Sequence, residues 1–232
     1  MSRIILMAMV LAVTVAGCNR FPDLTIQVSA NLVPSDPPEC AVVANQELIL
    51  LRGRYDLSPD APGFDYLIAP QIDSYLYDNS LDTQAPQTNF QVTGFEITIK
   101  LPDGSTPDFG EALPNPYLVT SSAVIPASTA LGGISSAAAV ASGIPSSYRP
   151  ALVAVLEGTE YNSIVIDIQA FGSTSGGFSQ KSPPFSWPID LCEGCLGTEC
   201  PEPAQEGDGI GCFPGQDGWQ WCETIVPADS AP

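Results

Sequence analysis

The sequence contains no histidine and few basic side chains. Seven Lys and Arg residues stand against 26 Asp and Glu residues, which gives a formal net charge of −19. Without histidine, the Ser-His and Cys-His nucleophile pairs and every histidine-ligated metal centre are excluded. The acidic balance also argues against a nucleic-acid partner, because nucleic acid requires a basic surface. Since only 14% of the residues are charged and 44% are hydrophobic, the composition predicts a folded protein rather than a disordered acidic one.

Motifs for other kinds of catalysis are equally scarce. The two lysines, Lys100 and Lys181, lack a serine three residues earlier, so the Ser-x-x-Lys motif is missing. Residues 172–176, Gly-Ser-Thr-Ser-Gly, resemble a nucleophile elbow, but the central residue is Thr174 and the surrounding pattern predicts a hairpin loop instead. We therefore expect no catalytic residue and no cofactor. Hydrolysis by two carboxylates stays open, because sequence spacing does not report separation in space.

The sequence has one long apolar run, and it lies at the N-terminus. A cationic start that includes Arg3 is followed by apolar residues 4–16 and then by small residues. This pattern is typical of a secretory signal peptide, which we place at residues 1–17. No other apolar stretch reaches the ~18 residues that a membrane-spanning helix needs.

The end of this segment, Val15-Ala16-Gly17-Cys18, resembles the lipobox of bacterial lipoproteins, although the family usually has leucine in place of Val15. The resemblance implies cleavage after Gly17, a diacylglycerol on the Cys18 thiol and an acylated new amine. Asn19 is not the aspartate associated with retention in the inner membrane, so the resemblance implies the outer membrane, with the leaflet undetermined. The alternative is an ordinary signal peptide with a chance cysteine at its end. If Cys18 is lipidated, residues 18–22 form a short tether and the lipid is the contact with the membrane.

Six cysteines remain in the mature chain, an even number that in an exported protein predicts three disulfides; they are Cys40, Cys192, Cys195, Cys200, Cys212 and Cys222. Because five of them lie after residue 191, full pairing requires one of these five to bond Cys40. We predict Cys192 as that partner, with Cys195–Cys200 and Cys212–Cys222 as local pairs. The spacing of Cys192 and Cys195 also suits zinc, but without histidine such a site would have to be all-cysteine, so we expect no metal.

Residues 23–191 carry repeated period-two patterns, which predict an all-β domain. The clearest case alternates Phe95, Ile97 and Ile99 with polar residues and ends at the Pro-Asp-Gly turn of residues 102–104. Seven to nine such strands with Pro- and Gly-rich connections favour an antiparallel, immunoglobulin-like β-sandwich. The predicted strands lie near residues 24–28, 47–55, 66–76, 95–101, 117–124, 151–156, 164–170 and 185–191.

One stretch departs from the strand pattern. Residues 126–143 are rich in Ala and Ser and include Gly132 and Gly133. They predict either a short helix over residues 134–142 or a mobile surface loop.

Residues 192–225 predict a small disulfide-stapled module, and residues 226–232 a frayed tail. This region resembles the cysteine-rich ends of uncharacterised bacterial lipoproteins through residues 191–196, Leu-Cys-Glu-Gly-Cys-Leu, and 212–217, Cys-Phe-Pro-Gly-Gln-Asp. Trp219 and Trp221 lie two residues apart, so in an extended conformation both rings face the same way. They are candidate partner-binding residues, and the alternative is that they form the core of the module with Phe213 and Ile225.

The aspartates around residue 80 suggest an alternative calcium site. Asp78, Ser80 and Asp82 resemble the start of a calcium loop, but Thr83 and Asn89 occupy the positions of the required glycine and glutamate, which excludes an EF-hand. A loop could still gather Asp73, Asp78 and Asp82 around calcium.

From the sequence as a whole we predict a lipid-anchored envelope protein with a non-enzymatic structural or protein-recognition role and an undetermined protein partner. The alternatives are a carbohydrate- or calcium-dependent binding module and a lipid-tethered hydrolase that uses carboxylates.

Overall fold

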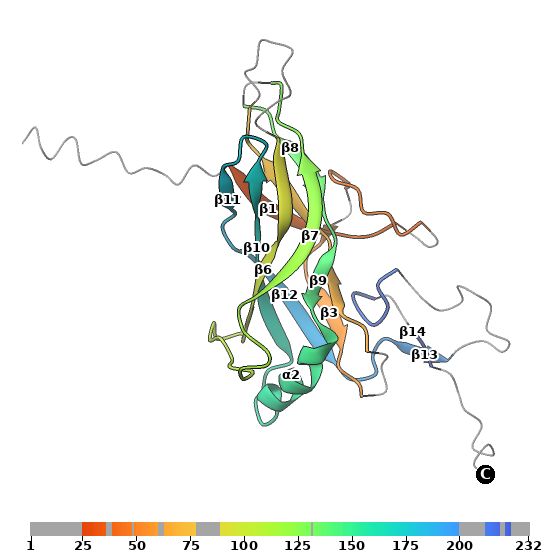
Figure 1. The fold of residues 1–232 in the computed structure, drawn as a ribbon. Coiled ribbons are helices and arrows are strands. Elements are labelled where there is room, and N and C mark those ends of the chain that lie inside the picture. Colours follow the sequence, from red (N-terminus) through yellow and green to blue (C-terminus); the bar gives the residue numbers. More distant parts are fainter. Residues whose placement is uncertain are drawn as a thin grey trace, which may run out of the picture.

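The chain is built mostly of β-strands, as its computed structural model shows (Figure 1). The structure describes residues 25–35, 39–47, 49–59, 63–77, 89–130, 132–199, 212–218 and 221–223. The elements are β1 (Ile26–Leu32), β2 (Ile49–Leu50), β3 (Gly53–Asp56), β4 (Tyr66–Ile68), β5 (Pro70–Ser74), β6 (Phe90–Lys100), β7 (Tyr117–Ile125), β8 (Ser135–Ala138), β9 (Ala141–Ile144), the 3₁₀ turn η1 (Ser146–Tyr148), α2 (Arg149–Leu156), β10 (Ser163–Thr174), β11 (Ser179–Lys181), β12 (Phe185–Cys192), β13 (Gly197–Glu199) and β14 (Trp221–Glu223).

These strands form two larger sheets and two small ones. The first large sheet has the order β3-β12-β10-β6-β7, with β11 added beside β10, and the second has the order β2-β1-β5-β8. The small sheets are the pairs β4-β9 and β13-β14. Most pairs are antiparallel, but β3 runs parallel to β12 and β13 runs parallel to β14. The prediction of a chain built from β-strands is therefore confirmed, with one short α-helix among the described residues. The first large sheet is mixed rather than purely antiparallel.

The longest strands follow the predicted alternation. Phe95, Ile97 and Ile99 of β6 are completely buried, and β6 pairs with β10 in a register that sets Ile97 opposite Ile168 and Ile99 opposite Ile166. Cross-strand pairs of β-branched residues of this kind stabilise a sheet. After β6 the chain turns as predicted, with Gly104 at a φ of 85° and the N–H of Leu101 bonded to the carbonyl of Ser105 at 2.9 Å.

The two large sheets share one apolar core. Ile26 and Val28 of β1 and Ile72 of β5 belong to the same buried cluster as the isoleucines of β6 and β10. Burial of these side chains removes apolar surface from water, which is the main favourable term in folding. The core therefore joins strands from both halves of the described chain.

The prediction for residues 134–142 was wrong, because this stretch contains β8 and β9 and not a helix or a loop. Strand β8 pairs with β5, and strand β9 pairs with β4, both in antiparallel orientation. Small side chains are required here, since a Cβ at Gly143 would lie 2.5 Å from Cγ2 of Ile68. Pairing with two unfilled strand edges thus outweighs the helix propensity of alanine.

The strand predicted at residues 151–156 was also wrong, because these residues lie in helix α2. The apolar run does not alternate with polar residues, and Pro150 occupies the first turn, where proline favours a helix. Leu152 anchors the helix by complete burial in the shared core. Helix α2 lies beyond the ends of the long strands (Figure 1).

Among the described residues, no helix is long and apolar enough to cross a membrane.

Candidate functional site

The last residue of β3, Asp56, is a completely buried carboxylate. It lies at the point where β3 and β12 end together, opposite Cys192 in the parallel register. Its Oδ1 accepts hydrogen bonds from the backbone N–H groups of Ser58 at 2.9 Å and Gly194 at 2.8 Å, and its Oδ2 accepts one from Leu196 at 3.1 Å. A buried charge needs such partners, so Asp56 ties the chain after β12 to the end of β3.

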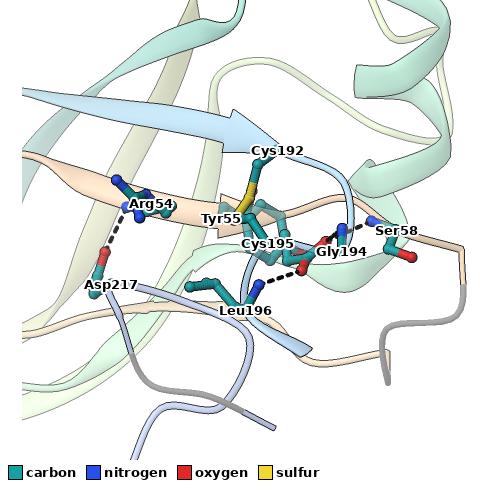
Figure 2. Close-up of a disulfide and its surroundings, with 9 residues drawn as sticks. Arg54, Tyr55, Ser58, Cys192, Gly194, Cys195, Leu196 and Asp217 are labelled. Atoms are coloured by element: carbon teal, nitrogen blue, oxygen red, sulfur yellow. Dashed lines mark hydrogen bonds between the residues drawn. A yellow bond between two sulfur atoms is a disulfide. The ribbon is translucent and has the colours of Figure 1, made fainter. Parts of the chain in front are cut away.

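A disulfide closes the loop that Asp56 holds. Cys192 bonds Cys195, with 5.9 Å between their Cα atoms, and Gly194 turns the chain at a φ of 68°. Figure 2 shows the disulfide beside the hydrogen bonds from Gly194 and Leu196. We call residues 192–195 the disulfide loop. It is fixed twice, by its own S–S bond and by Asp56.

The second disulfide joins Cys40 to Cys212, with 5.4 Å between the Cα atoms and a sequence separation of 172. The predicted link between Cys40 and the C-terminal region is thus present, but Cys192 as its partner was wrong. The local pairs Cys195–Cys200 and Cys212–Cys222 were also wrong, because Cys195 and Cys212 are already bonded. The tight turn at Gly194 brings Cys195, rather than a distant cysteine, to Cys192.

Several other predicted residues lie outside the described part of the chain. These are residues 1–17, the tether with Cys18, Asp78, Ser80, Asp82, Cys200, Trp219, the tail 226–232, and the side chains of Trp221 and Cys222. The predicted signal peptide, lipidation, tryptophan pair and full calcium set are therefore not described by the structure. Of the calcium candidates, Asp73 accepts hydrogen bonds from Ser136 Oγ at 2.7 Å and from Gln71 Nε2 at 3.1 Å.

A metal could in principle be held near the disulfide loop. One carboxylate oxygen of Asp56 and the sulfurs of Cys192 and Cys195 lie within 4.8 Å of one another. The two sulfurs are bonded to each other, and zinc is bound by free thiolates. In the disulfide form, therefore, this group does not offer the ligand set of a zinc site.

A groove of about 430 Å³ opens between helix α2, the end of β12 and the disulfide loop. We call it the α2 groove, and it contains both apolar and acidic side chains. Its lining residues are Leu57, Val153, Leu156, Glu157, Tyr161, Asn162, Leu191, Cys192 and Glu193. A pocket of this size with apolar walls and a few polar groups is the usual form of a binding site.

The wall of the groove at α2 is anchored by Arg149. Its guanidinium lies 5.5 Å from the centre of the Tyr55 ring and donates a hydrogen bond of 3.3 Å to the carbonyl of Phe64. Burial raises the pKa of the Tyr55 hydroxyl, and the nearby positive charge of Arg149 opposes that rise. Arg149 thus connects the start of α2 with β3 and with the segment that precedes β4.

A second cluster fixes residues 212–218 to the main domain. Gln216 exchanges two hydrogen bonds with the backbone of Leu67, from the Leu67 N–H at 2.5 Å and to its carbonyl at 2.7 Å. Asp217 accepts bonds from the Arg54 N–H at 2.8 Å and the Tyr66 hydroxyl at 2.9 Å. The Tyr66 oxygen in turn accepts a bond of 3.0 Å from Nε1 of Trp187.

Removal from water dominates the electrostatics of this cluster. It raises the pKa of Asp217 from 3.8 to about 6, and the hydrogen bonds from Arg54, Gln216 and Tyr66 only partly offset that effect. A small cavity of about 210 Å³ borders Asp217 and includes Arg52 and Asp190, which form an ion pair at 3.2 Å. The cluster therefore links the pH of the solution to the attachment of residues 212–218.

Sequence reasoning missed both Asp56 and Asp217. Asp56 and Gly194 are 138 residues apart and Tyr66 and Asp217 are 151 apart, so no local pattern joins them. The hairpin predicted at residues 172–176 is confirmed. Strands β10 and β11 pair around a turn in which the N–H of Thr174 bonds the carbonyl of Phe178 at 2.9 Å.

Comparisons of the chain with models of protein families, with curated proteins and with solved structures found no match.

Proposed function

We propose that the protein is an exported lipoprotein, anchored by lipid on Cys18 to the bacterial outer membrane, whose β domain has a non-enzymatic recognition or structural role. The proposal combines the N-terminal resemblance to a lipobox with a feature of the folded domain.

The observation that carries the proposal is the Cys40–Cys212 disulfide. Disulfides that staple distant parts of a chain persist in oxidising compartments, outside the bacterial cytoplasm. Export through a signal peptide at residues 1–17 supplies that environment. Thr25, where the described domain begins, follows Cys18 by seven residues, so the chain from Cys18 to Thr25 spans at most about 25 Å. The domain would lie next to the membrane surface.

A recognition role is favoured over catalysis by the state of the two lysines. Lys100 forms an ion pair with Asp167 at 2.5 Å, and Lys181 forms one with Glu96 at 2.7 Å. Each lysine Nζ is therefore paired with a carboxylate, whereas activation of a serine nucleophile needs a base at hydrogen-bond distance from the serine hydroxyl. With histidine absent from the chain, neither usual activator of a nucleophile is at hand.

We also infer that the two large sheets are the layers of an immunoglobulin-like sandwich. Support comes from the core that both sheets share, because two sheets packed over one core are the plan of such folds. The parallel strand β3 and the helix α2 would then be additions to that plan.

The anchor is tested by growing cells with radiolabelled palmitate and isolating the protein. The natural chain should be labelled, whereas Cys18→Ala should carry no label and should retain residues 1–17. Cys40→Ala is the control, since it also removes one cysteine but should be labelled normally. Palmitate in the Cys18→Ala protein would contradict the proposal.

A further inference from the structure

We propose that the α2 groove binds a Lys or Arg side chain of a partner polypeptide together with an apolar residue beside it. The inference rests on the recognition role proposed above and gives that role a site and a ligand chemistry. It follows from the charge, the apolar lining and the rigidity of the groove.

The charge of the groove is negative on two sides. Glu157 stands at the C-terminal cap of α2, and Glu193 lies in the disulfide loop; both are exposed, and both line the groove. The C-terminal end of a helix adds a partial negative charge of its own. Among the described residues of the lining none is basic, and the chain has no Lys or Arg after Lys181. A cation from a partner would therefore enter without competition from a basic side chain of the lining.

The groove is also partly lined by apolar side chains. Leu57, Leu156 and Leu191 line it, together with Val153, which remains 39% exposed. This lining suits the methylene stem of Lys or Arg and an adjacent apolar residue. Tyr161 contributes an aromatic ring, which attracts an organic cation further. A bare metal ion would make no use of these apolar walls, so a side chain is the better fit.

Both carboxylates are attached to rigid parts of the fold. The disulfide and the bond from Gly194 to Asp56 hold the backbone on either side of Glu193. The N–H of Glu157 bonds the carbonyl of Val153 at 2.9 Å, and the next turn is closed by Thr159, whose N–H and hydroxyl both bond the carbonyl of Leu156. A preformed site loses less conformational entropy when a ligand binds. The groove can thus recognise a cation without first being ordered.

The test measures the affinity of the full mature chain in detergent for three acetylated and amidated pentapeptides. One has arginine between two leucines, one has citrulline in its place, and one has glutamate. Citrulline keeps the shape of arginine without its charge. The peptides are tested at low and high ionic strength by fluorescence polarisation.

We expect the arginine peptide to bind roughly fivefold to tenfold more tightly than the citrulline peptide, as two exposed charge pairs would give. The glutamate peptide should bind most weakly, and salt should reduce the preference. Glu157→Gln combined with Glu193→Gln should remove the preference for arginine. Glu160→Gln, which changes the charge just after α2 but outside the groove lining, should leave it intact.

Equal affinity for arginine and citrulline would overturn the inference, and so would the absence of any binding. Binding of arginine that the double variant does not weaken would place the site elsewhere and would overturn it too. The palmitate experiment distinguishes these results from a failure of the proposed function. A chain labelled on Cys18 would remain an exported lipoprotein even if the groove bound no peptide.

Discussion

The hydroxyl of Tyr66 donates a hydrogen bond of 2.9 Å to Oδ1 of Asp217, across 151 residues of sequence. The pair joins strand β4 to the segment that Cys212 staples to Cys40. Burial raises the pKa of Asp217 to about 6 and raises that of Tyr66 well above its ordinary value. The Tyr66 hydroxyl therefore keeps its proton at every physiological pH, whereas the Asp217 carboxyl changes its charge near pH 6.

This relationship predicts that acid strengthens the attachment of residues 212–218. The folded state binds a proton at Asp217 below about pH 6, whereas the unfolded chain binds it only below its ordinary pKa of 3.8. The free energy of unfolding should therefore rise by up to about 3 kcal/mol as the pH falls from about 6 to 3.8. This gain should be lost when the pH rises again through about 6.

The natural chain and Asp217→Asn are compared by urea unfolding at about pH 4.5 and pH 7. Asparagine is the chosen substitution because it keeps an acceptor oxygen and tolerates the positive φ of 55° at this position. The difference between the two proteins isolates Asp217 from the general relief of charge repulsion. Asp103→Asn is a control expected to show no change between these two pH values, because bonds from Ser105 lower the pKa of Asp103 and its titration therefore lies below about pH 3.8. Identical pH profiles for the natural chain and Asp217→Asn would refute the prediction.

Gly53 makes room for the same bond. A Cβ at this position would lie 2.0 Å from the Tyr66 hydroxyl and 3.0 Å from Oδ1 of Asp217. We expect Gly53→Ala to lower the free energy of unfolding by roughly 2–3 kcal/mol, because the added methyl group would clash with a completely buried ring. Denaturant unfolding measures this loss. Gly63→Ala is the matched control, because nothing lies within 4 Å of its added methyl group; equal effects of the two variants would contradict the geometry.

Replacement of Asp56, the carboxylate that holds the disulfide loop, should lower the stability of the fold strongly. Asp56→Ala leaves three backbone N–H groups without an acceptor, which should cost roughly 3–5 kcal/mol of stability. Asp56→Asn keeps one acceptor oxygen and should cost less, about 1–2 kcal/mol. Both are compared with the natural chain by urea unfolding without reductant. A loss in Asp56→Ala as small as that of an exposed residue would show that the loop does not depend on this carboxylate.

The two disulfides should differ in their effect on stability. Replacing Cys40 and Cys212 together by alanine opens a loop with a sequence separation of 172, which the chain-entropy model values at about 5 kcal/mol. Replacing Cys192 and Cys195 together opens a separation of only 3, for which the same model gives about 2 kcal/mol. Non-reducing peptide mapping establishes the pairs, and denaturant unfolding compares the variants. A peptide that joins Cys40 to Cys192 would contradict the structure.

The sequence by itself determined the features that rest on local order. The alternation through Phe95, Ile97 and Ile99 predicted a strand with one buried face, and the turn at Gly104 followed from Pro-Asp-Gly. The count of cysteines required a link from Cys40 to the C-terminal region. The hydrophobic alternation and the turn residues depend on a few neighbouring positions, and the parity argument depends only on the number of cysteines. Both can therefore be read from the sequence without coordinates.

Only the tertiary structure decided the rest. Residues 135–138 and 141–144 became strands because β5 and β4 offered unpaired edges, against the helix propensity of their alanines. Cys40 met Cys212 because Gln216 and Asp217 dock that segment on β3 and β4. Asp56, Asp217 and the α2 groove each join residues that are far apart in the chain. Such contacts are set by packing and hydrogen bonding of the whole fold, and no local pattern in the sequence encodes them.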